Sequence, residues 1–504
     1  MKTTDILNTI SGDRSEHRYS FEVFVQNLLT HYYQLENVNY QVIEGREFGT
    51  LIVNGEFDNL KGEILIEVKS RLNRFPRSIF DSLVRRPLRD DKSTTIDHLV
   101  FISDITYSSQ FLDRIRFSEI TQDLPYKVHL WGSDKINEII NKYPDKSIEI
   151  AENIFSLRIE SKLKSTRRSW KEERGEKLLR IKGLFEKGQF SLFLGAGVSS
   201  SAGMPNWNTL LNSLFVEYLT NEFDNEKSIS DSDIKQIVSR LNEIDEPSAL
   251  MAARYLRKGL SKDKSEDEEF LKVITENLYK LKDKDKPLDS KLIKTICNLC
   301  MPKRTGAKVR SVITYNFDDL IERQLSKIEV DYHSIYTDNE SYELDELPIY
   351  HVHGFLPEDR QLYQDLDNST LVFSEEGYHK IYSDSFHWSN LVQLNSLREN
   401  SCLMIGLSLT DPNLRRLLEI ASRNNDRVKH FAFLKRIKTE EFINKQSSSK
   451  SKPKKVIKND AGAIEFLSRH HILNEELMKE LGVTIIWFEE YADIPRLLET
   501  LRSK

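Results

Sequence analysis

The first 155 residues alternate between apolar patterns of helical spacing and of strand spacing. In residues 21–33, Phe21, Phe24, Val25 and Leu28 recur at helical spacing and form one apolar face. Short apolar runs then predict strands near Tyr40, in TLIVNGEF, at 63–70, at 98–103 and in KVHLWG. The last run leads into a second helical pattern, DKINEIINKY. Residues 1–155 are therefore predicted to form one α/β or α+β domain.

The pattern changes at residues 156–187, where Lys, Arg and Glu dominate and apolar residues are few. These residues have high helical propensity. The segment is predicted to be a charged linker or exposed helix between two domains.

A second α/β domain is predicted from residue 188 to residue 504. Its short apolar runs are typical of strands that are buried on both faces of a parallel sheet, and they lie at 189–194, 309–316, 347–354, 401–408, 429–435 and 483–488. Two insertions interrupt it. Residues 221–294 are highly charged with helical patterns, and the Ser/Lys-rich residues 445–458 are typical of a mobile loop.

Composition narrows the class of protein. The 504 residues carry a net charge of -6, which argues against a globally electrostatic nucleic-acid or membrane binder. Three cysteines are too few for a disulfide framework and suit a reducing compartment. Neither a signal peptide nor an apolar stretch approaching the ~20 residues of a membrane span occurs in the sequence. We expect a soluble, cytoplasmic protein without a membrane partner.

The segment FLGAGVSSSAGMPNW, residues 193–207, carries the strongest candidate chemistry. An apolar strand runs into small residues that let the backbone approach a pyrophosphate, and a helix start beyond the turn supplies N–H donors. The candidate dinucleotide-binding residues here are Gly195, Ala196, Gly197, Ser199, Gly203 and Pro205.

Three further segments each end a predicted strand. They are TYNFD at 314–318, HVHGF at 351–355 and GLSLTDPNL at 406–414. Ligands of open α/β sheets bind at the carboxyl ends of the strands, so all four segments are expected at the same edge.

The order and content of these segments resemble the sirtuins, and more closely the bacterial sirtuin-like proteins of anti-phage defence, over about residues 177–501. The resemblance implies a Rossmann-like domain that binds NAD⁺ and that carries a helical insertion. It matches Asn316 and Asp318 to the Asn-Ile-Asp segment beside the nicotinamide ribose, and His353 to the histidine that precedes a glycine. Near the adenosine ribose it adds Gly406 and Ser408, and the extension with Asp411 and Asn413 is similar to the bacterial branch.

One departure from the sirtuins bears on the activity. Sirtuins carry a structural zinc module with two Cys-x-x-Cys pairs, whereas this chain has only Cys297 and Cys300 in a helical pattern, with Cys402 alone in a strand. We therefore expect no zinc and no acyl-lysine peptide groove. Water is then the plausible acceptor, and the expected reaction is hydrolysis of NAD⁺ to nicotinamide and ADP-ribose.

Each polar residue has an expected role in that reaction. Asn316 is expected to orient the water or a ribose hydroxyl, and Asp318 to orient the ribose or a neighbouring loop. His353 is the candidate general base, because the reference pKa of histidine lies near working pH. His351 lies two residues earlier and could face the same side of the strand; the glycine beside His353 favours His353.

The N-terminal domain holds a second candidate constellation. Asp58, Glu67 and Lys69 resemble the motif of the PD-(D/E)XK nucleases, in their Mrr-like restriction-endonuclease branch, over about residues 18–143, with Glu22 as a fourth member. The carboxylates of Asp58 and Glu67 could hold Mg²⁺ while the lysine activates water. Downstream arginines could meet phosphates or form an exposed helical face, and they are Arg71, Arg74, Arg77, Arg85, Arg86 and Arg89.

Three functions follow from these patterns. The first is an NAD⁺ hydrolase that acts as an abortive-infection effector against phage, with a nuclease-like module that senses or cleaves nucleic acid. The second is a Mg²⁺-dependent nuclease that a nucleotide-sensing sirtuin-like domain regulates. The third is a binding module whose silent nuclease-like domain recruits a partner. The family resemblance also implies a partner protein or phage trigger and a homo-oligomer.

Overall fold

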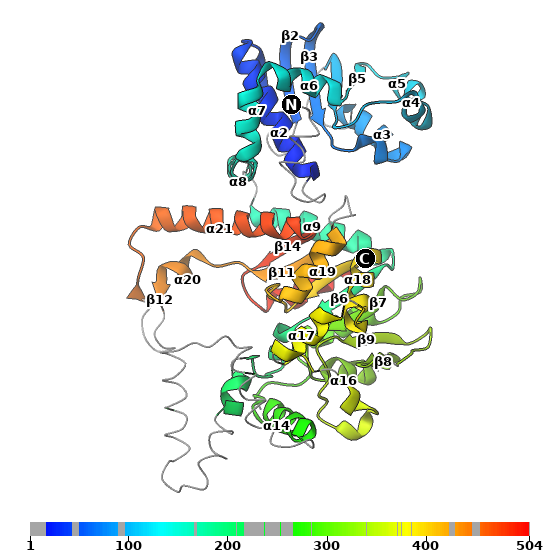
Figure 1. Cartoon of the computed structure of the whole chain (residues 1–504), viewed down its shortest axis with the longest axis vertical. Helices are drawn as coiled ribbons and strands as arrows, with labels where there is room; N and C mark the ends of the chain where they lie inside the picture. The colour runs from blue at the N-terminus through cyan, green and yellow to red at the C-terminus, as the bar shows by residue number, and fades with distance from the viewer. Residues whose placement is uncertain are drawn as a thin grey trace. The chain divides into compact units, whose positions relative to one another are not determined.

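The computed structural model describes residues 17–42, 50–88, 96–165, 169–207, 209–215, 236, 253, 266–283, 285–338, 340–369, 371–373, 375–384, 386–422, 429–445 and 454–502. The chain divides into two compact units. The first contains residues 1–169, 422–427 and 443–480, and the second contains residues 170–421, 428–442 and 481–504. Figure 1 labels the helices and strands of both units.

The first unit is built on a five-stranded mixed sheet in the order β1-β2-β3-β4-β5. β1 pairs with β2 and β2 with β3 in antiparallel fashion, whereas β3–β4 and β4–β5 are parallel. The strands are β1 (Asn39–Val42), β2 (Thr50–Phe57), β3 (Leu60–Val68), β4 (His98–Ile102) and β5 (Lys127–Trp131). All five strands predicted from the sequence for this region are present.

Both faces of this sheet are covered, because residues of β3 point alternately to opposite sides. Ile64, Ile66 and Val68 pack with helix α2, while Leu65 packs in a separate core with the helices that follow β3 and β4. The helices are α2 (His17–Leu35), α3 (Arg77–Val84), α4 (Ser109–Ile115), α5 (Phe117–Thr121), α6 (Ser133–Lys142), α7 (Pro144–Glu152) and α8 (Ile154–Ser165), with short 3-10 turns at η1 (Leu72–Arg74) and η2 (Arg86–Leu88).

The second unit is built on a seven-stranded sheet in the order β14-β11-β10-β6-β7-β9-β8. Every pairing in this sheet is parallel. The strands are β6 (Phe190–Leu194), β7 (Val309–Thr314), β8 (Tyr332–Ile335), β9 (Leu347–His351), β10 (Ser401–Ile405), β11 (His430–Lys435) and β14 (Val483–Phe488). Six of these strands were predicted; β8 was missed because YHSI is short and only half-buried.

Helices cover both faces of the parallel sheet. On one face, Leu192 and Leu194 of β6 share a core with Phe185 of α9 and Ile296 of α15. On the other face the Cys402 thiol of β10 donates to the Ser396 carbonyl of α18 at 3.4 Å. The helices are α9 (Trp170–Glu186), α10 (Ala196–Ser200), α14 (Glu266–Lys280), α15 (Lys291–Cys300), α16 (Leu320–Lys327), α17 (Glu375–Ser383), α18 (Trp388–Glu399), α19 (Pro412–Ser422), α20 (Thr439–Ile443) and α22 (Asp493–Arg502), with 3-10 turns at η3 (Arg360–Leu362) and η4 (Leu366–Asn368).

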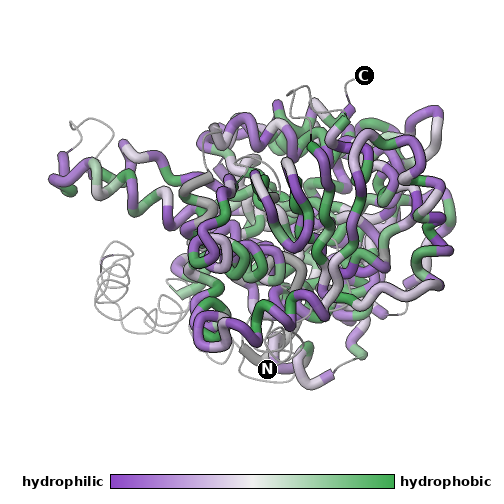
Figure 2. Tube along the Cα trace, turned by 90° about the horizontal axis from the view of Figure 1, so that it is seen from above, coloured by the Kyte–Doolittle hydropathy of each residue, from purple (hydrophilic) through white to green (hydrophobic). Residues whose placement is uncertain are grey.

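Hydropathy along the trace follows this layering. In Figure 2 hydrophilic stretches are common on the outer turns of the trace, and hydrophobic stretches are more frequent inside it. The predicted helical insertion at 221–294 lies mostly outside the described residues; α14 and the start of α15 are its described parts.

The segment 156–187 is not an extended linker. Most of it is helical, with α8 in the first unit and α9 in the second. Its few apolar side chains are placed to pack, since Ile181 and Phe185 of α9 are fully buried. Arg158 of α8 is also buried. A few apolar residues are therefore enough to pack these two helices against their units.

The first unit also contains residues that the sequence placed in the second domain. Helix α21 (Asp460–Glu480) is grouped with the N-terminal residues, as are the short strands β12 (Asn444–Lys445) and β13 (Lys454–Lys455). Part of the predicted loop at 445–458 thus forms a strand pair, and 446–453 lie outside the described residues. Arg158 of α8 contacts Glu476 of α21 at 3.1 Å, and both side chains are almost fully buried.

This buried ion pair generates a stability prediction. Arg158→Met should destabilise the first unit, by at most roughly 3–5 kcal/mol, because it removes the buried cation of Glu476 and leaves the partly exposed Lys479, at 2.9 Å, to balance the carboxylate. Urea unfolding of the full chain checks this. The double variant Arg158→Met/Glu476→Met should recover most of the loss, and Arg469→Met, which breaks an exposed pair on the same helix, should change stability by less than about 1 kcal/mol. Equal effects of Arg158→Met and Arg469→Met would contradict the packing of α21 on α8.

Candidate functional site

Four neighbouring strands bring the sequence segments of the second unit to one edge. The order β10-β6-β7-β9 is continuous and parallel, so the carboxyl ends of these strands lie side by side. Backbone hydrogen bonds extend the ladder into the turns: Gly195 N donates to Ile405 O at 3.0 Å, Tyr315 N to Leu194 O at 2.9 Å and Val352 N to Thr314 O at 3.1 Å. The turns that contain Gly195, Asn316, His353 and Gly406 therefore share one edge.

Two of these turns touch through glycine backbones. Gly197 N donates to Gly406 O at 3.0 Å. A Cβ atom added at Gly195 would lie 2.6 Å from Gly406 O, and one at Gly197 would lie 2.8 Å from Gly406 Cα. Gly406 itself has a φ of 72°, a conformation that side chains rarely adopt. Ala196 between the two glycines is exposed, so the turn presents bare backbone to a ligand.

Asn316 follows β7 and is buried, with 7% of its surface exposed. Its backbone N–H donates to Thr314 Oγ1 at 3.1 Å, and its carbonyl lies 3.2 Å from His351 Nδ1. The side-chain Oδ1 has no hydrogen-bond partner within the described part of the chain. A buried amide oxygen without a partner costs free energy, so it is a candidate group for binding substrate or water.

Asp318 is buried just before α16. Burial raises the pKa of Asp318 to about 6, although the Ser199 hydroxyl and the Leu320 N–H beside it counteract part of the rise. Leu320 N donates to Asp318 Oδ1 at 3.3 Å. The carboxylate thus lies near Ser199 of the glycine-rich turn, although the Ser199 hydroxyl makes no hydrogen bond within the described part of the chain.

His353 lies between two tyrosines. Its ring centroid is 4.6 Å from that of Tyr315 and 5.8 Å from that of Tyr378, both edge-on. Its Nε2 atom has no hydrogen-bond partner among the described residues. Burial lowers the pKa of His353, and the nearby Asp411 carboxylate acts in the opposite direction. The imidazole is therefore neutral at pH 7, as a general base requires.

Hydrogen bonds hold the Asp411 carboxylate in place beside His353. Tyr378 donates to Asp411 Oδ2 at 2.5 Å, and Leu414 N donates to Oδ1 at 2.7 Å. The distance from Oδ2 to His353 Nε2 is 3.9 Å. This carboxylate is placed to stabilise a positive charge on the His353 imidazole.

The sequence is similar to that of known proteins over part of its length. Residues 310–455 match the family model of the SIR2-like domain. The matched range includes the turns after β7, β9 and β10, whereas the glycine-rich turn after β6 precedes it. The chain is also 22% identical, over 335 residues, to the NAD(+) hydrolase ThsA of Enterococcus faecium. The aligned region covers 64% of this chain and 57% of the relative, so the chain spans little more than half of that protein.

Some residues that were predicted to bind the dinucleotide have other contacts in the second unit. Both ends of the Asn413 amide are occupied, since Nδ2 donates to Asn390 Oδ1 at 3.0 Å and Oδ1 accepts from Arg416 at 2.9 Å. Ser408 is exposed and its hydroxyl pairs with Thr410 at 2.6 Å. Asn413 therefore joins α18 to α19 instead of facing the site.

Gly203 and Pro205 belong to the turn after α10. Gly203 has a φ of 89°, and its carbonyl accepts from Asp283 N at 2.9 Å. Half-buried Pro205 follows it. The turn packs against Asp283 and Lys286. This contact is enough to explain a glycine at position 203, without any role in binding a ligand.

Sequence reasoning missed the aromatic and polar residues around His353 and His351. Tyr315 donates to Gln393 Oε1, Tyr378 donates to Asp411, and Glu322 contacts His351. Tyr315 lies within the TYNFD segment, where no role was expected for it, and no residue pattern marked Gln393 or Glu322. Their contacts join strands or turns to helices that are distant in sequence.

The cysteines predicted not to hold zinc are part of the core. Cys297 and Cys300 of α15 are both buried, and their thiols donate to the carbonyls of Ile321 and Ile296. They pack among the apolar residues of the second unit.

In the first unit, the structure does not bring Asp58 to Glu67 and Lys69. Asp58 lies in the turn between β2 and β3, is exposed and pairs with Lys135 at 2.7 Å. Glu67 lies near the other end of β3, and at about 3.3 Å per residue the two positions are separated by roughly 20 Å. The strand position opposite Glu67 is Thr50, which has no carboxylate. The predicted Mg²⁺ site formed by Asp58 and Glu67 was therefore wrong.

The remaining members of that motif are buried. Glu67 and Lys69, two residues apart, are each 1% exposed, and Glu22 of α2 is 3% exposed. No cluster of three or more His, Cys, Asp or Glu side chains suited to a metal ion occurs among the described residues. The arginines are partly neutralised, because Arg77 pairs with Glu119 and Arg85 with Asp81; Arg89 and the side chain of Arg74 lie outside the described part.

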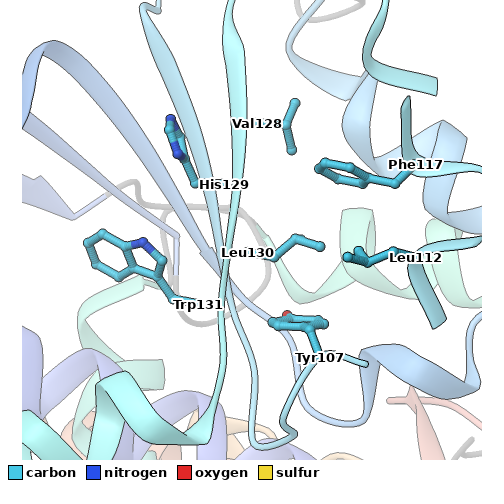
Figure 3. Close-up of a pocket in the computed structure, with 7 residues that line it drawn as sticks. All are labelled: Tyr107, Leu112, Phe117, Val128, His129, Leu130 and Trp131. Carbon is cyan, nitrogen blue, oxygen red and sulfur yellow. The ribbon is translucent and has the colours of Figure 1, made fainter. Parts of the chain in front are cut away.

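A pocket of about 340 Å³ lies beside β5 in the first unit. Figure 3 shows Val128 and Leu130 pointing from β5 toward Phe117, Leu112 and Tyr107, with His129 and Trp131 on the other side of the strand. The lining is largely apolar and aromatic, and it contains none of the predicted nuclease residues.

None of the helices in the described ranges is both long and apolar enough to cross a membrane.

The burial of Asp318 generates a second prediction. In the unfolded chain Asp318 loses its proton near pH 4, whereas in the folded chain it does so at about pH 6. The folded state therefore binds more protons between these values, and stability declines as pH rises through this window. Above pH 6.5, Asp318→Asn should raise the thermal midpoint, because it removes a cost of roughly 3 kcal/mol for ionising the buried carboxyl. The gain should vanish near pH 4. Thermal unfolding of both proteins at several pH values checks this. A gain that does not depend on pH would contradict the assigned burial.

Proposed function

We propose that the SIR2-like part of this chain hydrolyses NAD⁺ to nicotinamide and ADP-ribose, as an effector of anti-phage defence. The observation that carries the proposal is the convergence at one sheet edge of bare glycine backbone with two buried polar atoms that lack partners, Asn316 Oδ1 and His353 Nε2. The similarity to an NAD(+) hydrolase supports the choice of substrate. The second candidate function, a Mg²⁺-dependent nuclease, is less well supported, because Asp58 lies far from Glu67 and the two cannot hold one metal ion.

The proposed reaction breaks the bond between C1′ of the ribose and the nicotinamide nitrogen. The bonding electrons go to the nicotinamide ring, which leaves as a neutral molecule, and C1′ gains oxocarbenium character. The glycine turn after β6 lies against the pyrophosphate, because its small residues let the ligand approach the exposed backbone at Ala196 without steric conflict. Asn316 holds the water or a ribose hydroxyl in line with C1′, and the tyrosines around His353 exclude further water.

His353 takes the proton of the attacking water as the new C1′–O bond forms. Asp411, 3.9 Å from Nε2, stabilises the imidazolium that results. The proton then passes to solvent, so one NAD⁺ and one water give nicotinamide, ADP-ribose and one proton. Asp318 orients the ribose side of the turn.

The role of the first unit in this proposal is sensing rather than cutting. The Glu-x-Lys pair of the nuclease-like motif is present, but the carboxylate that would complete a metal site is at the far end of β3. We propose that this unit contacts nucleic acid or a partner protein as the trigger, and that the protein works in the cytoplasm as a homo-oligomer.

Removing the positioning group should abolish the reaction. Asn316→Ala should lower kcat by about 10²–10⁴-fold, since one positioning or general-base group contributes about that much, while the fold is retained because Oδ1 makes no hydrogen bond within the described structure. Release of nicotinamide from NAD⁺ by the full-length protein, with and without DNA, measures this. His353→Ala should fall in the same range, and the double variant should lose much less than the product of the two. Asn298→Ala and His333→Ala, both outside the site, are the controls. Full activity of folded Asn316→Ala would overturn the mechanism.

The pH profile tests the contact between Asp411 and His353. Because the pKa of His353 is lowered by burial and raised by Asp411, kcat/KM of the wild type should rise with pH through that pKa and then become flat at neutral pH. Asp411→Asn removes the carboxylate, so the pKa of His353 should fall and the acidic limb should move to lower pH. The exposed Asp345→Asn variant should leave the limb in place. A limb that moves to higher pH in Asp411→Asn would contradict the assignment of His353 as base.

A further inference from the structure

The second histidine of the HVHG segment has a position quite different from that of His353. His351 ends β9, and its side chain is completely buried. Its Nδ1 atom lies 3.2 Å from the carbonyl oxygen of Asn316, and its Nε2 atom lies 2.6 Å from Oε1 of Glu322 in α16. Glu322 is buried as well, with 1% of its side chain exposed. The ring therefore joins the turn that carries Asn316 to the helix that follows it.

The partners of this ring determine how many protons it holds. A neutral imidazole donates through only one nitrogen, but both nitrogens here face oxygen atoms. The Asn316 carbonyl can only accept. Glu322 Oε1 also accepts from Ser334 Oγ at 3.2 Å, which favours a carboxylate oxygen that carries no proton of its own. The arrangement is satisfied when both ring nitrogens carry protons, as an imidazolium–carboxylate pair that is neutral as a whole.

The charged groups around the pair are arranged so that His351 is the cation that faces Glu322. Arg323 lies one residue beyond Glu322 and is engaged by Asp319 at 2.9 Å and by Glu358 at 2.6 Å. The other titratable groups near Glu322 are carboxyl, phenol or thiol groups, none of them cationic: Asp318, Asp319, Tyr332, Tyr363 and Cys297. The ring of Phe355 covers the imidazole, with 4.0 Å between centroids. Among the described residues, His351 is the only cationic group paired with Glu322.

The pair acts on Asn316 through its backbone. Both polar backbone groups of Asn316 are held, the N–H by Thr314 Oγ1 and the carbonyl by His351, and the next carbonyl, of Phe317, accepts from Leu356 N at 2.7 Å. With the peptide planes on both sides fixed, the direction of the Asn316 Cα–Cβ bond is fixed, and this restricts where the side-chain amide can point. Groups that orient a functional residue in this way commonly contribute about 10–100-fold to activity.

We propose that the buried His351–Glu322 pair is a positioning device for Asn316: an imidazolium that donates to both Glu322 and the Asn316 carbonyl holds this turn and so aims the Asn316 side-chain amide at the substrate. This inference rests on the proposed NAD⁺ hydrolysis for its kinetic consequence. It also separates the two histidines of the segment, with His353 at the reacting atoms and His351 behind Asn316.

Kinetics of the full-length protein test the positioning role. His351→Phe keeps an aromatic ring against Phe355 but removes both donors, and kcat should fall about 10–100-fold with little change in KM. Glu322→Gln should cost less, because a glutamine amide can donate to Nε2 while Nδ1–H still donates to Asn316. His333→Phe, at a half-exposed histidine on β8, is the matched control and should leave kcat unchanged.

The double variant His351→Phe/Glu322→Met distinguishes positioning from simple packing. Apolar replacement of both partners removes the unpaired buried carboxylate, so the thermal midpoint should return toward the wild-type value. If the pair positions Asn316, kcat of the double variant should nevertheless stay low. Recovery of kcat together with stability would overturn the proposal.

A spectroscopic measurement tests the pair whether or not NAD⁺ is cleaved. The full-length protein, labelled with ¹⁵N at histidine, should show both ring nitrogens of His351 bonded to hydrogen at pH 7.5, assigned by their loss in His351→Phe. In Glu322→Gln only Nδ1 should retain a hydrogen. A wild-type ring with one protonated nitrogen would refute the charged pair, whereas an intact signature in a protein that does not hydrolyse NAD⁺ would refute the proposed function alone.

Discussion

The contact between the turns after β6 and β10 is the constraint on which the site of the second unit depends. Gly195 and Gly197 lie so close to Gly406 that a side chain at Gly195 or Gly197 would overlap the backbone of the other turn. This contact lets β10 and β6 end at the same level, and β7 and β9 continue the edge. The turns with Asn316 and His353 are thereby brought beside the exposed backbone of Ala196.

The polar groups at this edge fall into two kinds. Both ring nitrogens of His351 and both carboxylate oxygens of Asp411 contact hydrogen-bonding groups inside the protein, and Glu322 is bonded through Oε1. Asn316 Oδ1 and His353 Nε2 do not, within the described structure. The matched groups rigidify the turns, and the unmatched ones are left to a ligand. Such a division is what a preorganised site requires, because the cost of orienting its groups is met during folding.

The first unit shows how a motif in sequence can be separated in space. Asp58, Glu67 and Lys69 are close along the chain, yet β3 runs between Asp58 and the other two and carries them apart. Glu67 and Lys69 alone keep the alternation that places them on one side of the strand. The aromatic pocket beside β5 lies elsewhere in the unit and involves none of them.

The sequence by itself determined the strands and the glycine turn. Runs such as SCLMI and VTIIWF are apolar throughout, and this is the local signature of strands buried on both faces. It also placed Asn316, Asp318 and His353 at strand ends, since the position of a residue after a buried run is a local property. The tertiary structure alone decided which residues meet. The pairing of His351 with Glu322, the contact of Asp411 with His353, the membership of α21 in the first unit and the displacement of Asp58 all depend on strand order and register. Those are set by packing between segments far apart in the chain, which no local pattern of residues encodes.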